Sequence, residues 1–328
     1  MEKIISQSMN DSVLEKAYEL FNIKKDQVYF IGGFENLVYG FKKNNEDFIL
    51  RFVHSSHRTF ELVEAEIEFI NYLDFNKASV STIVLSSNNH IVEKIFSNNT
   101  YFSVSVFTKA PGGTIKKEEI TDEFIRSFGK EIGKLHILTK QFKPINHRHQ
   151  WYDENYIGIA KRTLKDNDLG IIDKMNEIIN QLKKADTSID SYGLIHADLH
   201  FGNIFVYEDI MTFFDWDDSS YQPFINDFSV IIFDMFAYSK LNFEERSKRA
   251  NEFLIPLFKG YEEVNKINKE WFDYFHLFMK YREIVMYIML HGAGEEVYNS
   301  PFGKRYLDGR YEKIMNDVPF LDMKIVLK

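Results

Sequence analysis

The sequence contains no cysteine, no long apolar run and no surplus of positive charge. Without cysteine, the chain can form neither a disulfide nor a thiolate-ligated metal site. The most apolar later stretch, residues 283–291, is too short and too closely flanked by charge to span a bilayer. The 49 acidic residues outnumber the 40 basic ones, giving a net charge of −9. This balance argues against a general nucleic-acid binder, which needs a basic face.

The chain has 328 residues, of which 45% are hydrophobic and 16% aromatic. That composition is ample for a sizeable core, and the length suits one large domain or two lobes. Residues 1–20 mix polar and apolar types and lack the unbroken apolar stretch of a signal peptide. We therefore expect a cytoplasmic protein without a membrane partner.

The first part of the chain mixes strands and helices. Runs rich in aromatic and β-branched residues predict strands at 28–31, 38–41 and 48–53. A loop with Gly32 and Gly33 separates the first two runs, and the polar segment KKNNED predicts a hairpin turn between the last two. Further expected elements are helices at 11–21 and 60–73, and strands at 83–84, 90–95 and 101–107.

The segment TKAPGGT, residues 108–114, predicts a hinge, because proline and glycine interrupt regular structure. Apolar residues at helical spacing dominate beyond it, with one strand-rich patch at 192–214. The pattern predicts an α+β fold with a small β-rich lobe, residues 1–108, and a larger, mainly helical lobe, residues 109–328, with a cleft at the hinge. Helices are expected from about 122 to 138, and at 243–261 and 269–291.

The most informative stretch is residues 193–218, in which polar residues flank two short apolar strands. His196, Asp198 and Asn203 lie before the strand at 204–206, and Asp215 ends the strand that follows. Phosphoryl transfer requires a carboxylate that orients the attacking hydroxyl and accepts its proton, and oxygen ligands for Mg²⁺. Asp198, five residues before Asn203, has the position in the motif that such a base requires. Magnesium prefers a few protein oxygens together with phosphates and waters.

Asn203 and Asp215 are therefore candidate Mg²⁺ ligands, and the loop with Gly32 and Gly33 is a candidate cradle for the phosphates. Aspartate and asparagine also favour ordinary turns, and a glycine pair also suits a plain hairpin turn. The joint occurrence of the catalytic run, the strand hairpin that ends in aspartate, and the separate glycine loop favours the phosphoryl-transfer interpretation.

The segment HADLHFGN, residues 196–203, resembles the H-G/A-D-x-x-x-x-N loop of the aminoglycoside phosphotransferase and choline kinase-like family. FDW at 214–216 resembles the I-D-W/F-x-x-A segment of that family. The family is a branch of the protein-kinase fold. It includes antibiotic, choline, methylthioribose and homoserine kinases, and bacterial stress-response kinases that act on protein. The resemblance extends from about residue 27 to about 235 and implies a protein-kinase-like bilobal fold.

The resemblance also implies roles for individual residues. His196 would brace the catalytic loop, and Asp227 would brace the core behind it. Arg51 would take the place of the strand cation that pairs with a helix glutamate, here Glu66. The residues expected to contact the nucleotide are Gly32, Gly33, Phe34, Asn36, Arg51 and Glu66.

Three departures from the family pattern affect these assignments. Protein kinases have lysine where this chain has Arg51, and the planar arginine fork binds phosphate differently. The nucleotide loop has only two glycines. Asp217 and Asp218 add carboxylates beside the metal aspartate; Asp217 is a candidate ligand of a second Mg²⁺, and Asp218 is expected to cap a helix or face the substrate.

The sequence therefore predicts a Mg²⁺-dependent kinase that transfers the γ-phosphate of ATP, or of GTP, to a hydroxyl group of a small molecule. The sequence leaves open whether the acceptor is aminoglycoside-, choline- or homoserine-like. The alternatives are a protein Ser/Thr kinase of the same fold and a catalytically silent nucleotide-binding protein. Most of the aromatic residues at 271–290 are expected in the core, and a minority are expected to line an acceptor pocket. For Glu295 and Glu296 two interpretations are open: partners of a cationic acceptor, or solvated charges on the surface.

Overall fold

The computed structural model describes residues 3–33 and 35–323, which form two compact units. Unit 1 consists of Met1–Gly113, Phe142–Arg148 and Phe205–Asp217, and unit 2 of Thr114–Gln141, His149–Ile204 and Asp218–Lys328. Unit 1 thus includes two segments from beyond the expected hinge, and a lobe boundary at residue 108 stays a prediction. Across the two described ranges, no helix has the length and apolar character needed to cross a bilayer.

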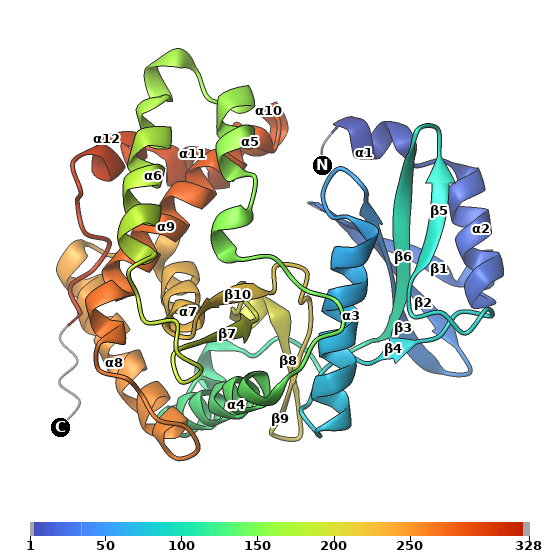
Figure 1. Cartoon of the computed structure of the whole chain (residues 1–328), viewed down its shortest axis with the longest axis horizontal. Helices are drawn as coiled ribbons and strands as arrows, with labels where there is room; N and C mark the ends of the chain where they lie inside the picture. Colours follow the sequence, from blue (N-terminus) through green and yellow to red (C-terminus); the bar gives the residue numbers. More distant parts are fainter. Residues whose placement is uncertain (1–2, 34, 324–328) are drawn as a thin grey trace. The chain divides into compact units, whose positions relative to one another are not determined.

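An antiparallel sheet forms the centre of unit 1 (Figure 1). The polar turn between its second and third strands has Asn44 and Asn45 at positive φ, 54° and 66°. Asparagine tolerates this conformation, which matches the twist of a tight hairpin, so the expected hairpin is confirmed. In order across the sheet, the strands are β1 (Val28–Gly32), β2 (Leu37–Lys43), β3 (Glu46–His54), β6 (Thr100–Thr108) and β4 (Ile83–Val84), with β5 (Glu93–Ser97) also paired to β6.

The two faces of this sheet are covered by different helices. Successive residues of a strand point to opposite faces. Leu50 and Phe52 of β3 join an apolar cluster with α2 (Asp11–Phe21), whereas Arg51 reaches Glu66 on α3 (Phe60–Phe75). Figure 1 shows α2 and α3 on opposite sides of the sheet. The strand alternation therefore directs the one charged residue in the middle of β3 toward α3.

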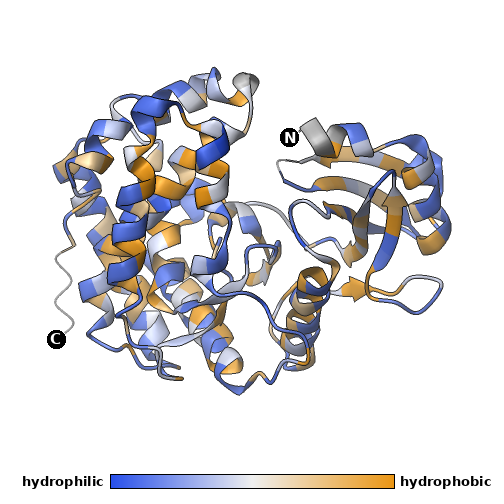
Figure 2. Ribbon diagram, turned by 45° about the horizontal axis from the view of Figure 1, so that its top comes forward, coloured by the Kyte–Doolittle hydropathy of each residue, from blue (hydrophilic) through white to orange (hydrophobic). Residues whose placement is uncertain are grey.

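Unit 2 is mainly helical. The helix α4 (Asp122–Gln141) packs along α8 (Phe243–Glu262), and α7 (Ile225–Ala237) packs against α9 (Trp271–Gly292). Apolar residues gather on the faces that these helices turn toward one another (Figure 2). The strands β7 (Tyr192–Ile195) and β10 (Ser220–Pro223) form a short antiparallel pair.

The remaining elements are short. The helix α1 (Lys3–Ser8) lies at the beginning of the described chain. The hairpin of β8 (Ile204–Tyr207) and β9 (Ile210–Phe213) follows the candidate catalytic loop. The helices of unit 2 not yet given are α5 (Tyr156–Thr163), α6 (Gly170–Leu182), α10 (Glu295–Tyr298), α11 (Pro301–Leu307) and α12 (Arg310–Met315). Single turns of 3₁₀ helix occur at Lys25–Gln27, Lys117–Glu119, Trp151–Asp153, Asp166–Asp168 and Phe201–Asn203.

One expected strand begins later than the sequence predicts. The run at 90–95 reads as a strand, but β5 begins at Glu93. Ser86 and His90 close a turn before it, because the Ser86 N–H donates to the His90 carbonyl oxygen (2.9 Å) and Asn89 adopts a positive φ of 61°. Local turn hydrogen bonds thus replace the first strand pairs that the β-branched residues favour.

The close crossing of α4 and α8 generates a stability prediction. A Cβ atom at Gly129 would lie 1.9 Å from the Leu257 carbonyl oxygen, and one at Gly260 would lie 1.7 Å from that of Arg126. Because backbone atoms must move to admit the methyl group, Gly129→Ala and Gly260→Ala should each lower the free energy of unfolding by about 1–3 kcal/mol. Urea denaturation measures the loss.

Gly170→Ala in α6 is the matched control for these two variants. Its Cβ would meet no backbone atom, only the far ends of two side chains, Met315 at 3.2 Å and the Tyr311 hydroxyl at 3.3 Å. Alanine also has the higher helix propensity, so this variant should be destabilised by less than about 1 kcal/mol or be stabilised. An equal loss of stability in all three variants would contradict the close-packing explanation.

Candidate functional site

The candidate catalytic loop follows β7 and lies in unit 2. Ala197 adopts a positive φ of 67°, a conformation that costs energy for a residue with a Cβ atom. The carboxylate of Asp227 on α7 holds this turn, because its Oδ1 accepts the Ala197 N–H (2.9 Å) and its Oδ2 lies 3.0 Å from His136 Nε2. Asp227 therefore braces the loop from within the core, where His196 is also buried.

The carboxylate of Asp198 is surrounded by donors from its own loop and from α9. Its Oδ1 pairs with the guanidinium of Arg282, and its Oδ2 lies 3.3 Å from His200 Nε2 and accepts from Asn203 Nδ2 (3.1 Å). Burial opposes ionisation, but the charge of Arg282 and the hydrogen bond from His200 hold the pKa of Asp198 well below its usual range. Asp198 is therefore a fixed carboxylate that retains lone pairs for a further donor.

The orientation of His200 and Asn203 follows from their backbone contacts. The Gly202 N–H donates to His200 Nδ1 (2.9 Å), so in the neutral ring the proton is on Nε2 and faces Asp198. The Asn203 amide nitrogen donates to the Asp198 carbonyl oxygen (2.9 Å) as well as to its carboxylate. The nitrogen is thereby committed to the loop, and the amide oxygen of Asn203 is the atom that can ligate a metal, as Mg²⁺ chemistry requires.

Sequence reasoning missed Arg282. This residue lies 84 positions after Asp198, in the aromatic helix α9, and its side chain is only 17% exposed. The charges of Asp198 and Asp218 raise the pKa of Arg282 although burial acts against the charged form. The signal that could have found it is an arginine in the middle of an apolar helix, since a buried guanidinium requires a carboxylate partner.

In unit 1, Arg51 and Glu66 form the expected ion pair. Arg51 Nη1 and Nη2 donate to the two carboxylate oxygens of Glu66 at 2.8 and 2.7 Å, and both residues are buried. The guanidinium also lies 4.9 Å from the centre of the Phe107 ring. This is a buried bidentate pair and not a surface contact, so Arg51 has a single fixed position.

Asp215 lies beside this pair, two residues after β9. Its carboxylate is 3.9 Å from Arg51 Nη1, and its side chain is 53% exposed. Asp215 adopts a positive φ of 62°, which turns the chain sharply at the end of the hairpin. An exposed carboxylate next to a buried guanidinium fits the predicted oxygen ligand of Mg²⁺.

Asp217 is buried and already paired within unit 1. Its Oδ2 lies 2.7 Å from His57 Nε2 and 3.8 Å from Arg58 Nε, and Glu35 Oε2 lies 3.7 Å from the same His57 nitrogen. Against the effect of burial, His57 and Arg58 hold the pKa of Asp217 well below its usual range. Ligand atoms of Glu35, His57 and Asp217 fall within 4.8 Å of one another, but Arg58 and His57 already supply positive charge there. A metal-binding role of Asp217 stays a prediction.

The candidate nucleotide loop joins β1 and β2. A Cβ atom at Gly33 would lie 2.1 Å from the Asn36 carbonyl oxygen, so the tight turn requires glycine there. Gly32 ends β1, where the pairing with β2 shifts register after Phe30. Asn36 Oδ1 is buried and accepts no hydrogen bond from the described residues. Phe34 and the side chains of Glu295 and Glu296 lie outside the described part of the chain.

The structure thus groups the predicted site residues into two sets. Within unit 1, Arg51 contacts Glu66 and Asp215, and Asp217 lies in the same unit. Within unit 2, Asn203 contacts Asp198, and His196 lies in the same loop. The roles that join the two sets in one reaction stay predictions.

Asp218 follows Asp217 in a turn before β10, so the helix-capping role considered for it is wrong.

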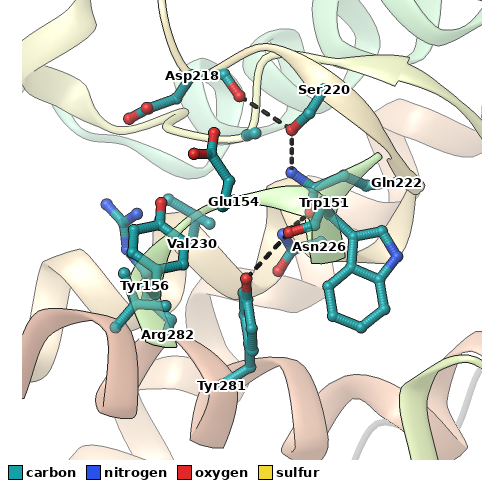
Figure 3. Close-up of a pocket in the computed structure, with 12 residues that line it drawn as sticks. Trp151, Glu154, Tyr156, Asp218, Ser220, Gln222, Asn226, Val230, Tyr281 and Arg282 are labelled. Atoms are coloured by element: carbon teal, nitrogen blue, oxygen red, sulfur yellow. Dashed lines mark hydrogen bonds between the residues drawn. The ribbon is translucent and has the colours of Figure 1, made fainter. Parts of the chain in front are cut away.

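Unit 2 also contains a pocket of about 30 Å³ next to the catalytic loop (Figure 3). The loop contributes Ala197, the neighbour of Asp198, and α9 contributes Arg282. Tyr281, from the aromatic stripe of α9, also lines this pocket, and its expected place in an acceptor pocket stays a prediction. Sequence reasoning missed Glu154, which is contributed by the segment after η3 (Trp151–Asp153). The other principal lining side chains are Trp151, Tyr156, Asp218 and Asn226.

Comparison with known sequences supports the resemblance seen in the motifs. Residues 27–264 match the phosphotransferase enzyme family. Amicoumacin kinase of Bacillus subtilis (strain 168) is 30% identical over 285 residues, which cover 86% of this chain and 84% of that protein. The matched region includes both sets of predicted site residues.

Comparison with solved structures confirms the kinase-like α+β fold. An amicoumacin kinase in complex with AMP-PNP, Ca²⁺ and Ami has a TM-score of 0.91 at 27% identity, over 99% of this chain and 98% of that chain. A microcompartment-associated aminopropanol kinase has a TM-score of 0.73 at 16% identity, over 94% of this chain and 98% of that chain. The aminopropanol kinase is too distant in sequence to show more than the fold.

The buried pair in unit 1 generates a second stability prediction. Glu66→Ala leaves the guanidinium of Arg51 buried without its bidentate partner, so the free energy of unfolding should fall by about 3–5 kcal/mol. Denaturant unfolding monitored by circular dichroism measures this change.

Glu19→Ala removes a glutamate from an exposed pair with Lys16 and serves as the control. Solvent screens that pair, and its loss should change stability little. If Glu66→Ala were tolerated as well as Glu19→Ala, Arg51 would not depend on Glu66 for its charge balance.

Proposed function

Because the chain belongs to the phosphotransferase enzyme family, we propose that it transfers the γ-phosphate of ATP to a hydroxyl group of a small molecule, in a Mg²⁺-dependent reaction. The observation that carries the proposal is the carboxylate of Asp198, which is ionised and held by Arg282, His200 and Asn203 beside a pocket. Such a group suits a reaction in which catalysis is largely positioning and charge stabilisation.

In the proposed reaction, the acceptor oxygen bonds to the γ-phosphorus as the bond to the β–γ bridging oxygen breaks, and ADP leaves. Asp198 orients the hydroxyl and accepts its proton. Bound Mg²⁺ neutralises negative charge on the phosphates. The oxygen donors of Asn203 and Asp215 fit Mg²⁺, and we propose them as its ligands on the basis of the sequence motif that includes both. We assign Arg51 and the loop with Gly32, Gly33, Phe34 and Asn36 to the nucleotide.

Amicoumacin is the first acceptor to test, because the 30% identical relative is an amicoumacin kinase. Radiolabelled phosphate transfer from ATP, and separately from GTP, should be measured with Mg²⁺ against amicoumacin, aminoglycosides, choline, homoserine, methylthioribose and a generic protein substrate. Transfer to one small acceptor far above background would support the proposal. Transfer to protein alone would favour the Ser/Thr kinase alternative, and nucleotide binding without any transfer would favour the silent binding protein.

Asp198→Ala should abolish transfer. Loss of a positioned general base costs about 10²–10⁴-fold in rate, whereas nucleotide affinity should be largely retained because Asp198 is assigned to the acceptor hydroxyl. Asp190→Ala, which removes an exposed carboxylate of unit 2, is the control and should keep the wild-type rate. A near-normal rate in Asp198→Ala would refute its assignment as the base.

Asp215→Ala should instead weaken the binding of Mg²⁺ and ATP together. Loss of even an outer-shell partner typically costs about 10–100-fold in metal affinity, so loss of a direct ligand should cost at least as much. Isothermal titration calorimetry with ATP, in Mg²⁺ and again in EDTA, separates the metal-dependent part of the affinity. An unchanged Mg²⁺ dependence would remove Asp215 from the ligand set.

A further inference from the structure

Residues 142–148 belong to unit 1, and we call this segment the strap. Its backbone is irregular, and Ile145 at its centre is 86% exposed. At its beginning, the Phe142 ring packs against Phe69 and Tyr72 of α3, with centroids 4.9 Å from each. A segment with so exposed a centre depends on specific contacts at its backbone and its ends to stay in place.

Helix α3 holds the middle of the strap through the carboxylate of Glu68. Glu68 Oε1 accepts the Ile145 N–H (2.6 Å), and its Oε2 accepts the Asn146 N–H (2.9 Å). Hydrogen bonds to a charged carboxylate are stronger than those between neutral groups, and two of them on consecutive residues fix the direction of the chain. The strap is therefore already attached to α3 where it reaches its last residue.

That last residue, Arg148, joins two elements of unit 1. It is 3% exposed, and its Nη1 donates to the Leu62 carbonyl oxygen on α3 (2.8 Å). Its Nη2 donates to the carbonyl oxygen of Asp217. Because the guanidinium is planar and rigid, the two bonds together set the position of the segment at Asp217 relative to α3.

The segment that Arg148 holds contains the candidate Mg²⁺ ligand. Asp215 lies two residues before Asp217, has an exposed side chain and adopts a positive φ of 62°. This backbone conformation is uncommon for a residue with a Cβ atom, so contacts of the neighbouring residues must maintain it. Trp216 is 2% exposed, and its ring packs edge-on against Phe69 of α3, with centroids 5.6 Å apart. The turn that presents Asp215 is thus held through the residues that follow it.

Helix α3 contacts Asp215 through a second set of side chains as well. Glu66, one helical turn after Leu62, receives two hydrogen bonds from Arg51, and Arg51 Nη1 lies 3.9 Å from Asp215 Oδ1. A shift of α3 relative to the turn would therefore change the surroundings of Asp215. Arg148 opposes such a shift because it bonds to the backbone of both elements.

We propose that Arg148 is a positioning residue for the Mg²⁺ site. It holds the turn at Asp215 against α3, so that the Asp215 carboxylate and the Arg51–Glu66 pair have one fixed arrangement before metal and nucleotide bind. The assignment rests on the proposed phosphotransferase function and on Asp215 as a metal ligand. Arg148 acts through main-chain carbonyls, as residues behind a metal ligand do when they orient it.

Nucleotide affinity with and without metal tests the proposal. Isothermal titration calorimetry should compare AMP-PNP binding in Mg²⁺ and in EDTA for the wild-type chain, Arg148→Ala and Arg148→Lys. Arg148→Ala should reduce the gain in affinity from Mg²⁺ about tenfold or more and leave the affinity in EDTA unchanged within about twofold. Arg148→Lys keeps the charge but lacks the fork that spans two carbonyls, so it should restore only part of the Mg²⁺ effect.

Control variants separate positioning from a general loss of stability. Arg126→Ala removes the guanidinium of an exposed pair with Glu263 in unit 2 and should change neither affinity. Gly260→Ala, which is expected to destabilise unit 2, should keep the wild-type Mg²⁺ effect. Circular dichroism melting curves verify folding. Should Arg148→Ala fail to fold, Arg148→Lys and Glu68→Gln, which leaves the strap one carboxylate oxygen fewer, should still reduce the Mg²⁺ effect.

Backbone hydrogen exchange in the ligand-free chain gives a measurement that involves no metal. Loss of the hydrogen bonds from Arg148 should speed exchange about tenfold or more both in α3 and at residues 213–217, and leave α4 and α8 unchanged. Unchanged exchange at either α3 or residues 213–217 would contradict the coupling of these two elements.

Two outcomes of the calorimetry would overturn the proposal: a wild-type Mg²⁺ effect in folded Arg148→Ala, or an equal loss of affinity in Mg²⁺ and in EDTA. Binding of AMP-PNP requires no phosphate transfer, so the two claims can fail separately. A reduced Mg²⁺ effect in Arg148→Ala, in a chain that transfers phosphate to no acceptor, would contradict the proposed function and leave the role of Arg148 standing. Transfer by the wild-type chain, with an unchanged Mg²⁺ effect in Arg148→Ala, would support the kinase and overturn that role.

Discussion

The ion pair between Asp198 and Arg282 links the parts of unit 2 on which the proposed function depends. The aspartate belongs to a loop at the end of β7, held by Asp227, and the arginine belongs to α9. The pair fixes the carboxylate without help from a ligand, and Arg282 also lines the pocket next to the loop. The same contact therefore pre-organises the proposed base and connects its loop with the neighbouring pocket.

The sequence predicted the elements whose periodicity is strong. The helix expected at 11–21 is α2, and the strand expected at 48–53 lies within β3. The strand expected at 90–95 was wrong at its beginning, because hydrogen bonds around Ser86 form a turn that β propensity does not reveal. Local patterns therefore predicted elements well but not the side-chain contacts that end them.

The site residues were predictable where they share a short motif. Asp198 and Asn203 are five positions apart, and their contact follows from the loop itself. Arg282 and Glu154 come from distant parts of the chain, and only the packing of unit 2 brings them to the loop and its pocket. No spacing rule connects residues 154, 198 and 282, so sequence reasoning singled out Asp198 but missed Glu154 and Arg282.

The composition of unit 1 has a consequence for synthesis on the ribosome. The buried aspartate that pairs with His57 and Arg58 is residue 217, and Arg148 donates to its carbonyl oxygen, so three separated stretches must meet. A nascent chain that ends at residue 114 contains His57 and Arg58 without the carboxylate of Asp217. Completion of unit 1 must therefore await the emergence of nearly two-thirds of the chain, because its last segment ends at Asp217.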